Sequence, residues 1–291
     1  MLSEITKLSP AKINLYLKVK GKRVDGYHNI ESLMTFCDYG DLISVKKSDK
    51  FNLIIEGPFA RSLENKENLI ETTIKKIESF YKRKFKVTVR LTKNLPISSG
   101  MGGGSSNAAT LIRCIKGIYN LETSDSFNKL LLSIGADVPF CFYGKTAFVE
   151  GVGEKVEFLD KGLKEYYILL VNPKIEISTK EIFESLNITK LKSKKAFERR
   201  SSKKIDINAL LKMGNDLEKE VVKRHMIISE VLSILSSCKE TLISRMTGSG
   251  ATCFALCDNL EDLKKVEFEI KDKFKDVWVK RSKLINSTEN I

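Results

Sequence analysis

The residues best suited to chemistry lie in a glycine-rich stretch at positions 94–112, NLPISSGMGGGSSNAATLI. Gly100, Gly102, Gly103 and Gly104 fall within it, after a strand-like run that ends near residue 92 and before an alanine-rich helical run. Glycines remove side chains from a turn, so its backbone N–H groups can face an anion, and the start of the next helix adds partial positive charge. The stretch is therefore predicted to bind phosphate.

Two familiar phosphate-binding motifs fit this stretch poorly. A P-loop ends in Gly-Lys followed by Ser or Thr, and no lysine stands at that place. A dinucleotide-binding turn needs an acidic ribose ligand about twenty residues later, but Glu122, the nearest candidate, follows the helix in a turn. A merely flexible loop is the other alternative, and the position between strand and helix argues against it.

Two further segments carry polar side chains that are unusual for their surroundings. Lys12 and Asn14 lie in the alternating run 9–17, SPAKINLYL, so both side chains leave the same face of a strand. Read alone, Lys12 would be an ordinary surface lysine. Asp137 is the one carboxylate in the apolar segment 134–142, IGADVPFCF, where an acid needs a partner to keep its charge. Capping of the following turn is the alternative role for Asp137.

Two small-residue turns complete the candidate site. The segment 246–256, MTGSGATCFAL, places Gly248 and Gly250 between two strand-like runs, where a backbone can approach a ligand; a plain hairpin is the alternative. The segment 23–33, RVDGYHNIESL, places Tyr27 and His28 after an Asp-Gly turn. A tyrosine ring can stack on a flat ligand, and an imidazole can hydrogen-bond to the ligand's edge.

Together these segments resemble the GHMP kinases, named after galactose, homoserine, mevalonate and phosphomevalonate kinases. Pro96, three residues and then Gly-Met-Gly look like the phosphate loop of that superfamily. Residues 102–109, GGGSSNAA, resemble more specifically its diphosphocytidyl-methylerythritol kinase family. Residues 246–256 resemble the family's third motif. The resemblance covers both halves, because residues 215–225, NDLEKEVVKRH, are similar to the family's helical segment before that motif.

The chain departs from the family pattern at three positions. Ser98 and Ser99 stand where glycines are common, and Lys180 stands where the family often has proline. The serines bear on the flexibility of the loop, and Lys180 bears on the geometry of its own segment. A lysine near a diphosphate is nevertheless chemically reasonable.

The resemblance implies an ATP-dependent kinase that phosphorylates the 2-hydroxyl of 4-diphosphocytidyl-2-C-methyl-D-erythritol, in the non-mevalonate route to isoprenoid precursors. It assigns Asp137 as the base that accepts the proton of the attacking hydroxyl. It assigns Lys12 the task of keeping Asp137 ionised and stabilising the transferring phosphoryl group. ATP implies Mg²⁺ as well, for which the sequence identifies no ligands.

The remaining site residues are also implied by the resemblance. Those expected to bind the acceptor are Asn14, Tyr27, His28, Thr179 and Phe183. Those expected to bind ATP are Asn68, Pro96, Gly100, Met101, Gly102, Gly103, Gly104, Ser105, Ser106, Gly248 and Gly250. A helix cap is the alternative role for Asn68.

Rival functions are another GHMP kinase, acting on homoserine, mevalonate or a sugar, and a GHMP-fold sensor that binds ligand without turnover. Tyr27, His28 and Phe183 speak against the first, because a pyrimidine needs an aromatic shelf and hydrogen bonds to its edge. Lys12 and Asp137 speak against the second. A basic nucleic-acid-binding protein is a third reading, suggested by the charge.

The formal net charge is +13, contributed by lysines along the whole chain. Residues 190–204 are the densest basic stretch, and Phe197 is the one aromatic residue within it that could stack on a base. A solvated surface is therefore favoured over a nucleic-acid stripe. We expect a small-molecule substrate, no nucleic-acid or membrane partner, and a monomer or homodimer.

The compartment is inferred from the cysteines and from the first residues. Residues 1–8 are mixed in polarity and carry Glu4, unlike a secretory signal, and no apolar run approaches the length of a membrane span. The six cysteines are scattered and predicted to be buried free thiols. We therefore expect a cytoplasmic protein.

The elements that must position these residues can be read from periodicity. Strands are predicted at 11–20, 30–36, 42–46, 51–56, 85–91, 146–150 and 167–171, and helices at 68–81, 105–119 and 124–133. The order that follows is helix, basic loop, helix, helix, strand, strand, helix, strand, and its last four elements are expected at 242–246, 252–256, 260–274 and 277–280.

The length of 291 residues suggests two domains that share a cleft. The fold class expected from the resemblance is α+β, a two-domain GHMP kinase fold. Its parts are an N-terminal mixed α/β ATP-binding domain at 1–160 and a C-terminal α+β ferredoxin-like domain at 161–291, with the active site between them.

Overall fold

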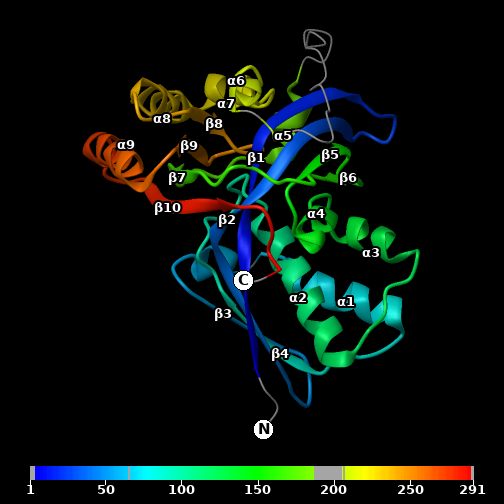
Figure 1. The fold of residues 1–291 in the computed structure, drawn as a ribbon. Helices are drawn as coiled ribbons and strands as arrows, with labels where there is room; N and C mark the ends of the chain where they lie inside the picture. Colours follow the sequence, from blue (N-terminus) through cyan, green and yellow to red (C-terminus); the bar gives the residue numbers. More distant parts are fainter. Residues whose placement is uncertain (1–3, 65, 187–204, 206, 290–291) are drawn as a thin grey trace.

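The computed structural model describes residues 4–64, 66–186, 205 and 207–289 (Figure 1). The basic stretch at 190–204 lies outside these residues, so the structure does not bear on its predicted solvated character. In the described part, strands from both halves of the chain join in one ten-stranded sheet, along which β3, β4, β2, β10, β7, β9 and β8 follow one another.

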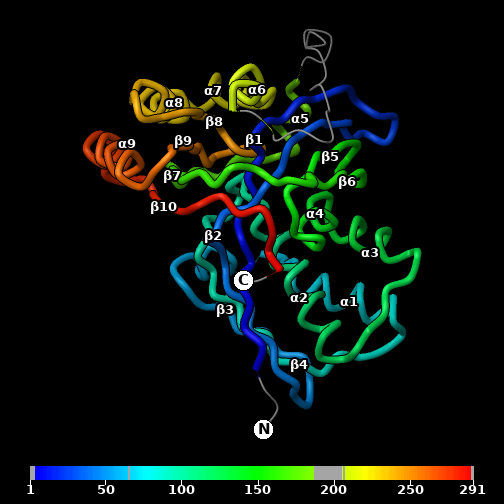
Figure 2. The backbone as a smooth tube through the Cα atoms, in the orientation of Figure 1, coloured from blue at the N-terminus to red at the C-terminus, as the bar shows by residue number. Residues whose placement is uncertain are grey.

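A long antiparallel hairpin forms the spine of the molecule. It consists of β1 (Ile5–Lys22) and β2 (His28–Lys47), the blue strands that cross Figure 2 from one end of the fold to the other. The sequence predicts β2 as two strands, 30–36 and 42–46, because residues 37–41 break the alternation. The pairing runs on because Gly40 lies against β1, where a Cβ would be 2.0 Å from the Ser9 carbonyl oxygen.

The first half of the sheet is covered by helices on one side (Figure 1). Its other strands are β3 (Asn52–Glu56), β4 (Val87–Thr92), β5 (Ala147–Gly151) and β6 (Lys155–Phe158). Its helices are η1 (Ala60–Leu63), α1 (Leu69–Tyr81), α2 (Gly103–Tyr119), α3 (Phe127–Ile134) and α4 (Val138–Tyr143). The apolar face predicted for α1 is confirmed, since Ile70, Ile74 and Ile77 pack in the core with Ile115 of α2.

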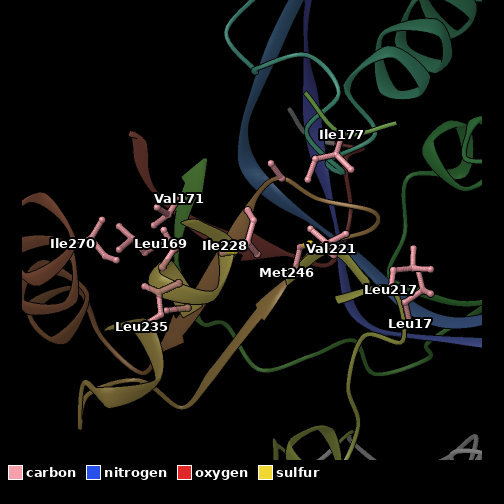
Figure 3. Close-up of a cluster of buried hydrophobic side chains, with 14 of the residues drawn as sticks. Leu17, Leu169, Val171, Ile177, Leu217, Val221, Ile228, Leu235, Met246 and Ile270 are labelled. Atoms are coloured by element: carbon pink, nitrogen blue, oxygen red, sulfur yellow. The ribbon is translucent and has the colours of Figure 1, made fainter. Parts of the chain in front are cut away.

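The second half packs its helices on the other part of the sheet. Its strands are β7 (Tyr167–Asn172), β8 (Ile243–Met246), β9 (Cys253–Cys257) and β10 (Trp278–Ile285). Its helices are α5 (Thr179–Glu184), α6 (Ile207–Leu211), α7 (Glu218–Arg224), α8 (Met226–Ser237) and α9 (Leu260–Lys273). Figure 3 shows their shared core, in which Leu17 of β1 lies beside Leu217.

Most predicted elements are present, with five differences in the described residues. Besides the single strand β2, the structure adds η1, α4 and β6, and places three helices, α6, α7 and α8, where two are predicted. Each added element is six residues or shorter, too short for periodicity to identify. All six cysteines are free thiols, as predicted, and five are buried while Cys238 is half-buried.

The predicted domain boundary at residue 160 falls between β6 and β7. Two features cross it: Leu17 and Val19 of β1 enter the core of the second half, and β10 pairs with both β7 and β2. The division into 1–160 and 161–291 stays a prediction. Among the described helices, none has the length and apolar character needed to cross a membrane.

The helix that follows the phosphate loop depends on its buried face. Ile115→Ala on α2 removes a fully buried side chain, so the free energy of unfolding should fall by about 2–5 kcal/mol. Met226→Ala, at a side chain that is 74% exposed, should change it by about 0.5 kcal/mol or less. Urea titrations of both variants measure this, and equal losses would contradict the assignment of this core.

Candidate active site

A cleft of about 980 Å³ lies between the two halves and collects most of the predicted site residues. Those that line it are Lys12, Asn14, Tyr27, His28, Asn68, Pro96, Gly100, Gly102, Gly103, Gly104, Ser105, Asp137, Thr179, Phe183 and Gly248. They come from segments far apart in the chain, so only the tertiary fold brings them together.

Three predicted residues do not line the cleft. Met101 is fully buried in a hydrophobic core. Ser106 is buried and accepts a hydrogen bond from the Ser9 hydroxyl at 3.1 Å. Gly250 packs against Met246, whose sulfur would lie 2.6 Å from an added Cβ.

The glycine stretch forms a left-handed turn that leads into α2. Gly100 has φ +72° and Gly102, the N-cap of α2, has φ +62°. A Cβ on Gly102 would lie 3.0 Å from Lys12 Cε and 3.4 Å from Asp137 Oδ2. The loop backbone therefore reaches the lysine and the aspartate because no side chain stands between them.

The departure at Ser98 falls at a special backbone position. Ser98 has φ +47°, in the left-handed region where glycine is favoured, while Ser99 is buried and its carbonyl accepts from the N–H of Thr252 at 3.2 Å. The turn keeps the glycine-like conformation in spite of the serine, because hydrogen bonds to the second half hold its neighbour.

Lys12 and Asp137 meet at the centre of the cleft. Their Nζ and Oδ2 atoms are 3.2 Å apart, and only 5% of the lysine side chain is exposed. Nζ also donates to Asn14 Oδ1 at 2.7 Å and to the Gly100 carbonyl at 3.3 Å. The lysine is therefore no surface residue, and its same-face prediction with Asn14 is confirmed.

Asp137 occupies the N-cap position of α4 but makes no side-chain capping hydrogen bond. The alternative role of Asp137 as a cap is therefore wrong. The carboxylate instead faces Lys12 and keeps 28% of its side chain exposed to the cleft. One oxygen thus balances the buried ammonium while the group stays reachable by a substrate.

Asn14 is held on three sides. Its Nδ2 donates to the Ser32 hydroxyl at 2.9 Å, and its backbone N–H donates to Thr247 Oγ1 at 2.9 Å, while its Oδ1 accepts from Lys12. Because both polar atoms of the side chain are engaged, the geometry gives Asn14 the task of orienting Lys12. Its predicted contact with the acceptor stays a prediction.

The third motif is both a hairpin and a wall of the site. β8 and β9 pair antiparallel around the turn at 247–252, as the plain-hairpin alternative requires. The same turn faces the phosphate loop, as the resemblance implies: a Cβ on Gly248 would lie 2.7 Å from the Gly100 carbonyl oxygen. The two loops touch through backbone atoms.

A buried polar cluster beneath the phosphate loop is absent from the sequence predictions. Asp41 is fully buried and accepts from Lys93 Nζ at 2.6 Å, Asn107 Nδ2 at 2.9 Å, and the N–H groups of Asn94 and Leu95 at 2.8 Å each. Burial lowers the pKa of Lys93, and Asp41 opposes that shift. The signal in the sequence is Asp41, which stands with a second acid, Asp38, between two apolar runs, and it names no partner by itself.

Two amides on the cleft wall keep an unused hydrogen-bonding atom. Asn68 Oδ1 caps α1 by accepting from the Ile70 N–H at 2.9 Å, which confirms the cap, but its buried Nδ2 has no hydrogen-bond partner among the described residues. Asn107 Oδ1 is likewise buried and has no partner in the part of the chain that the structure describes. A donor and an acceptor are therefore left for a ligand on this side of the cleft.

Aromatic rings gather at the opposite end of the cleft. The rings of His28 and Phe183 lie 5.1 Å apart at 32°, and Tyr27 beside them is 65% exposed. Burial, with Lys22 adding to it, lowers the pKa of His28 below its usual 6.5, which favours the neutral ring with one donor and one acceptor nitrogen. Thr179 joins this end to the third motif through a 2.7 Å hydroxyl contact with Ser249.

The close approach of the two loops yields a sharp test. A Cβ on Gly100 would lie 2.2 Å from the Thr247 carbonyl oxygen, at a φ that L-residues rarely adopt, so Gly100→Ala should reduce phosphoryl transfer by at least about tenfold. Gly117→Ala, on the exposed face of α2 with nothing within 4 Å, should stabilise the fold by about 0.5–1 kcal/mol and leave turnover intact. ATP turnover and thermal melts measure both, and a fully active Gly100→Ala variant would contradict the loop contact.

Comparison with protein families agrees with this architecture. The model of the GHMP kinase N-terminal domain matches residues 68–145, and that of the GHMP kinase C-terminal domain matches residues 193–276. A relative from Clostridium novyi, named 4-diphosphocytidyl-2-C-methyl-D-erythritol kinase, is 36% identical over 286 residues, covering 94% of this chain and 98% of its own. One from Chelativorans with the same name is 38% identical, covering 86% of this chain and 85% of its own.

Solved structures show the same fold. A 4-(cytidine 5'-diphospho)-2C-methyl-D-erythritol kinase superposes with a TM-score of 0.74 at 24% identity, over 96% of this chain and 99% of the other. A homoserine kinase from Cytophaga hutchinsonii gives a TM-score of 0.68 at 17% identity, over 99% of this chain and 96% of the other. The predicted fold class is confirmed, and the chain belongs to the 4-diphosphocytidyl-2-C-methyl-D-erythritol kinase family of the GHMP kinases.

Proposed function

We propose that this kinase transfers the γ-phosphoryl group of ATP to the 2-hydroxyl of 4-diphosphocytidyl-2-C-methyl-D-erythritol, in the methylerythritol phosphate route to isoprenoid precursors. The observation that carries the proposal is the Lys12–Asp137 pair, 3.2 Å apart and covered by Gly102 of the phosphate loop. A carboxylate that can act as a base, its ammonium partner and a glycine-rich loop thus share one cleft. The names of the relatives supply the acceptor.

In this proposal Asp137 accepts the proton of the attacking hydroxyl. Lys12 keeps the carboxylate ionised and offsets the negative charge that spreads over the phosphoryl oxygens in the transition state. Its position supports both tasks, because Nζ bonds to the Gly100 carbonyl as well as to Asp137. The base and the charge stabiliser therefore touch the loop that binds the phosphates.

ATP lies along the phosphate loop with its base toward the unused amides. Asn68 Nδ2 can donate to a ring nitrogen of adenine, and Asn107 Oδ1 can accept from an exocyclic amine or a ribose hydroxyl. Gly103 and Gly104 begin α2, so the helix N-terminus faces the phosphates. Pro96, Ser105 and Gly248 line the same wall.

Mg²⁺ accompanies ATP in this proposal. The described residues contain no group of three or more acidic, histidine or cysteine side chains that could hold a metal by themselves. Mg²⁺ is commonly held by substrate phosphates and water with few protein ligands, and the hydroxyl of Ser105 on the cleft wall would be one such ligand. Bound there, the ion would neutralise phosphate charge.

The cytidine diphosphate tail of the acceptor lies at the aromatic end. Tyr27 and Phe183 offer faces for a pyrimidine ring, and the neutral His28 offers a donor and an acceptor for its edge. Thr179 and Asn14 line the path from that end to Lys12. A sugar or mevalonate has no flat base to use these rings.

The two halves act as domains, 1–160 and 161–291, on either side of the cleft. The six free cysteines suit a reducing compartment, and we propose a cytoplasmic monomer or homodimer that acts on a small molecule, with no nucleic-acid or membrane partner.

The function is tested by ATP consumption with Mg²⁺ and 4-diphosphocytidyl-2-C-methyl-D-erythritol, beside mevalonate, homoserine and galactose. We expect turnover with the cytidylated alcohol alone, and Asp137→Asn, which keeps the shape but not the charge, should lower kcat by about a hundredfold or more. Glu176→Gln, which removes an exposed ion pair with Lys66, serves as the matched control and should keep full activity.

Other outcomes of this assay would overturn parts of the proposal. Preference for another alcohol would remove the assigned role of Tyr27, His28 and Phe183. Tight nucleotide binding without turnover on any of the four alcohols would favour the ligand sensor. An active Asp137→Asn variant would exclude Asp137 as the base.

The acceptor end makes a separate prediction. Phe183→Leu keeps an apolar side chain against His28 but removes the ring face, so KM for the cytidylated acceptor should rise about tenfold while KM for ATP stays within about twofold. Initial-rate kinetics with each substrate varied in turn measure this. Equal increases in both KM values would show that Phe183 shapes the whole cleft and does not read the base.

A further inference from the structure

The segment 215–218, Asn-Asp-Leu-Glu, lies outside the cleft apart from Leu217, yet its polar side chains hold backbone groups of other segments. Asn215 Nδ2 donates to the carbonyls of Met246 at 2.8 Å and Gly248 at 2.7 Å. Its Oδ1 accepts from the Leu217 N–H at 3.0 Å, and the residue is only 7% exposed. One amide thus uses both of its donor hydrogens, and its oxygen, to hold backbone groups of two segments.

The turn held by Asn215 is the one that touches the phosphate loop. Between the two carbonyls stands Thr247, whose Oγ1 accepts from the Asn14 N–H at 2.9 Å and lies 3.5 Å from the Gly100 carbonyl oxygen. The same Gly100 carbonyl accepts from Lys12 Nζ. A continuous set of contacts therefore runs from Asn215 through Thr247 to Gly100 and Lys12.

Neighbouring side chains hold the same two segments. Glu218 Oε2 accepts from the Met246 N–H at 2.8 Å, and Asp216 Oδ2 accepts from the Val19 N–H of β1 at 2.9 Å. β1 also bonds the segment through its backbone, since the Asp216 N–H donates to the Leu17 carbonyl at 2.9 Å. The strand that carries Lys12 and the turn at 246–250 are thus fixed to one short segment.

We propose that Asn215 is a positioning residue for phosphoryl transfer: by holding the Met246 and Gly248 carbonyls, it sets Thr247, and through it the Gly100 carbonyl and Lys12, in their reactive arrangement. Among the side chains of this segment, Asn215 alone bonds on both sides of Thr247 in the described residues. We expect Asn215 to affect the transfer step, because its contacts lead to Gly100 and Lys12. ATP binding should change little, because Asn68 and Asn107, the amides proposed to bind ATP, lie on other segments.

The test is Asn215→Asp, which keeps the size and the acceptor for Leu217 but replaces both donations by carboxylate–carbonyl repulsion. We expect kcat to fall about tenfold to a hundredfold, while the Kd of MgADP, measured by calorimetry, stays within about threefold. Asp216→Asn, which keeps an acceptor for Val19, is the matched control and should keep kcat. If Asn215 were merely structural, Asn215→Asp would lower the melting temperature but leave kcat unchanged at temperatures well below the melting point. That result would overturn the proposal.

A second pair of variants covers the case in which Asn215→Asp does not fold. Thr247→Val removes the hydroxyl between Asn14 and Gly100 at nearly constant shape and should lower kcat as Asn215→Asp does. Thr247→Ser keeps the hydroxyl, and its kcat should stay close to that of the unmodified protein. Equal activity of the two would overturn the proposed path.

The proposal rests on the kinase function but not on the identity of the acceptor. The variants are therefore compared on whichever alcohol the unmodified protein phosphorylates best, and on ATP hydrolysis without acceptor. Failure with the cytidylated alcohol alone would count against the proposed substrate and leave this comparison intact. Absence of phosphoryl transfer to any alcohol or to water would overturn both.

Discussion

The burial of one ammonium group governs the arrangement of the site. A lysine that is nearly inaccessible must recover the hydration it loses, and Lys12 does so with an acid, an amide and a backbone carbonyl. These partners, Asp137, Asn14 and Gly100, belong to three separate segments. The pair can form only when the first strand, the phosphate loop and the start of α4 are all in place, so the fold and the chemistry have the same requirement.

The absence of side chains is what allows those segments to meet. Gly102 passes over the lysine and the aspartate, and Gly100 and Gly248 bring two turns into backbone contact. A single added Cβ would block each of these contacts. Glycine also adopts the left-handed φ values of these positions at no steric cost. Ser98 adopts the same left-handed conformation with a side chain, so the turn is enforced by its surroundings and not only by glycine.

The two ends of the cleft differ in chemistry. Beneath the loop, Asp41 gathers Lys93, Asn107 and two backbone N–H groups into a buried polar cluster that fixes the base of the loop. At the other end, rings and a neutral imidazole form an apolar shelf. A polar, strongly anchored end suits triphosphate and nucleoside, and an aromatic end suits a flat base carried by the acceptor. The lysine-rich surface contributes a positive field that favours anionic ligands of both kinds.

The sequence by itself determined most strands, the long helices, the glycine turn before α2 and the same-face position of Lys12 and Asn14, because these follow from local periodicity and from glycine. Tertiary structure decided what local patterns cannot carry. It makes β2 one strand across Gly40, pairs Asp137 with Lys12 and leaves it no capping role. It also buries Met101 and Ser106 outside the cleft lining, and it lets Asp41 and Asn215 hold loops that are distant in sequence. The physical reason is that a buried polar side chain takes as its partner whichever group the fold brings within hydrogen-bonding distance. That group can be far away in the sequence: Lys12 and Asp137 are 125 residues apart.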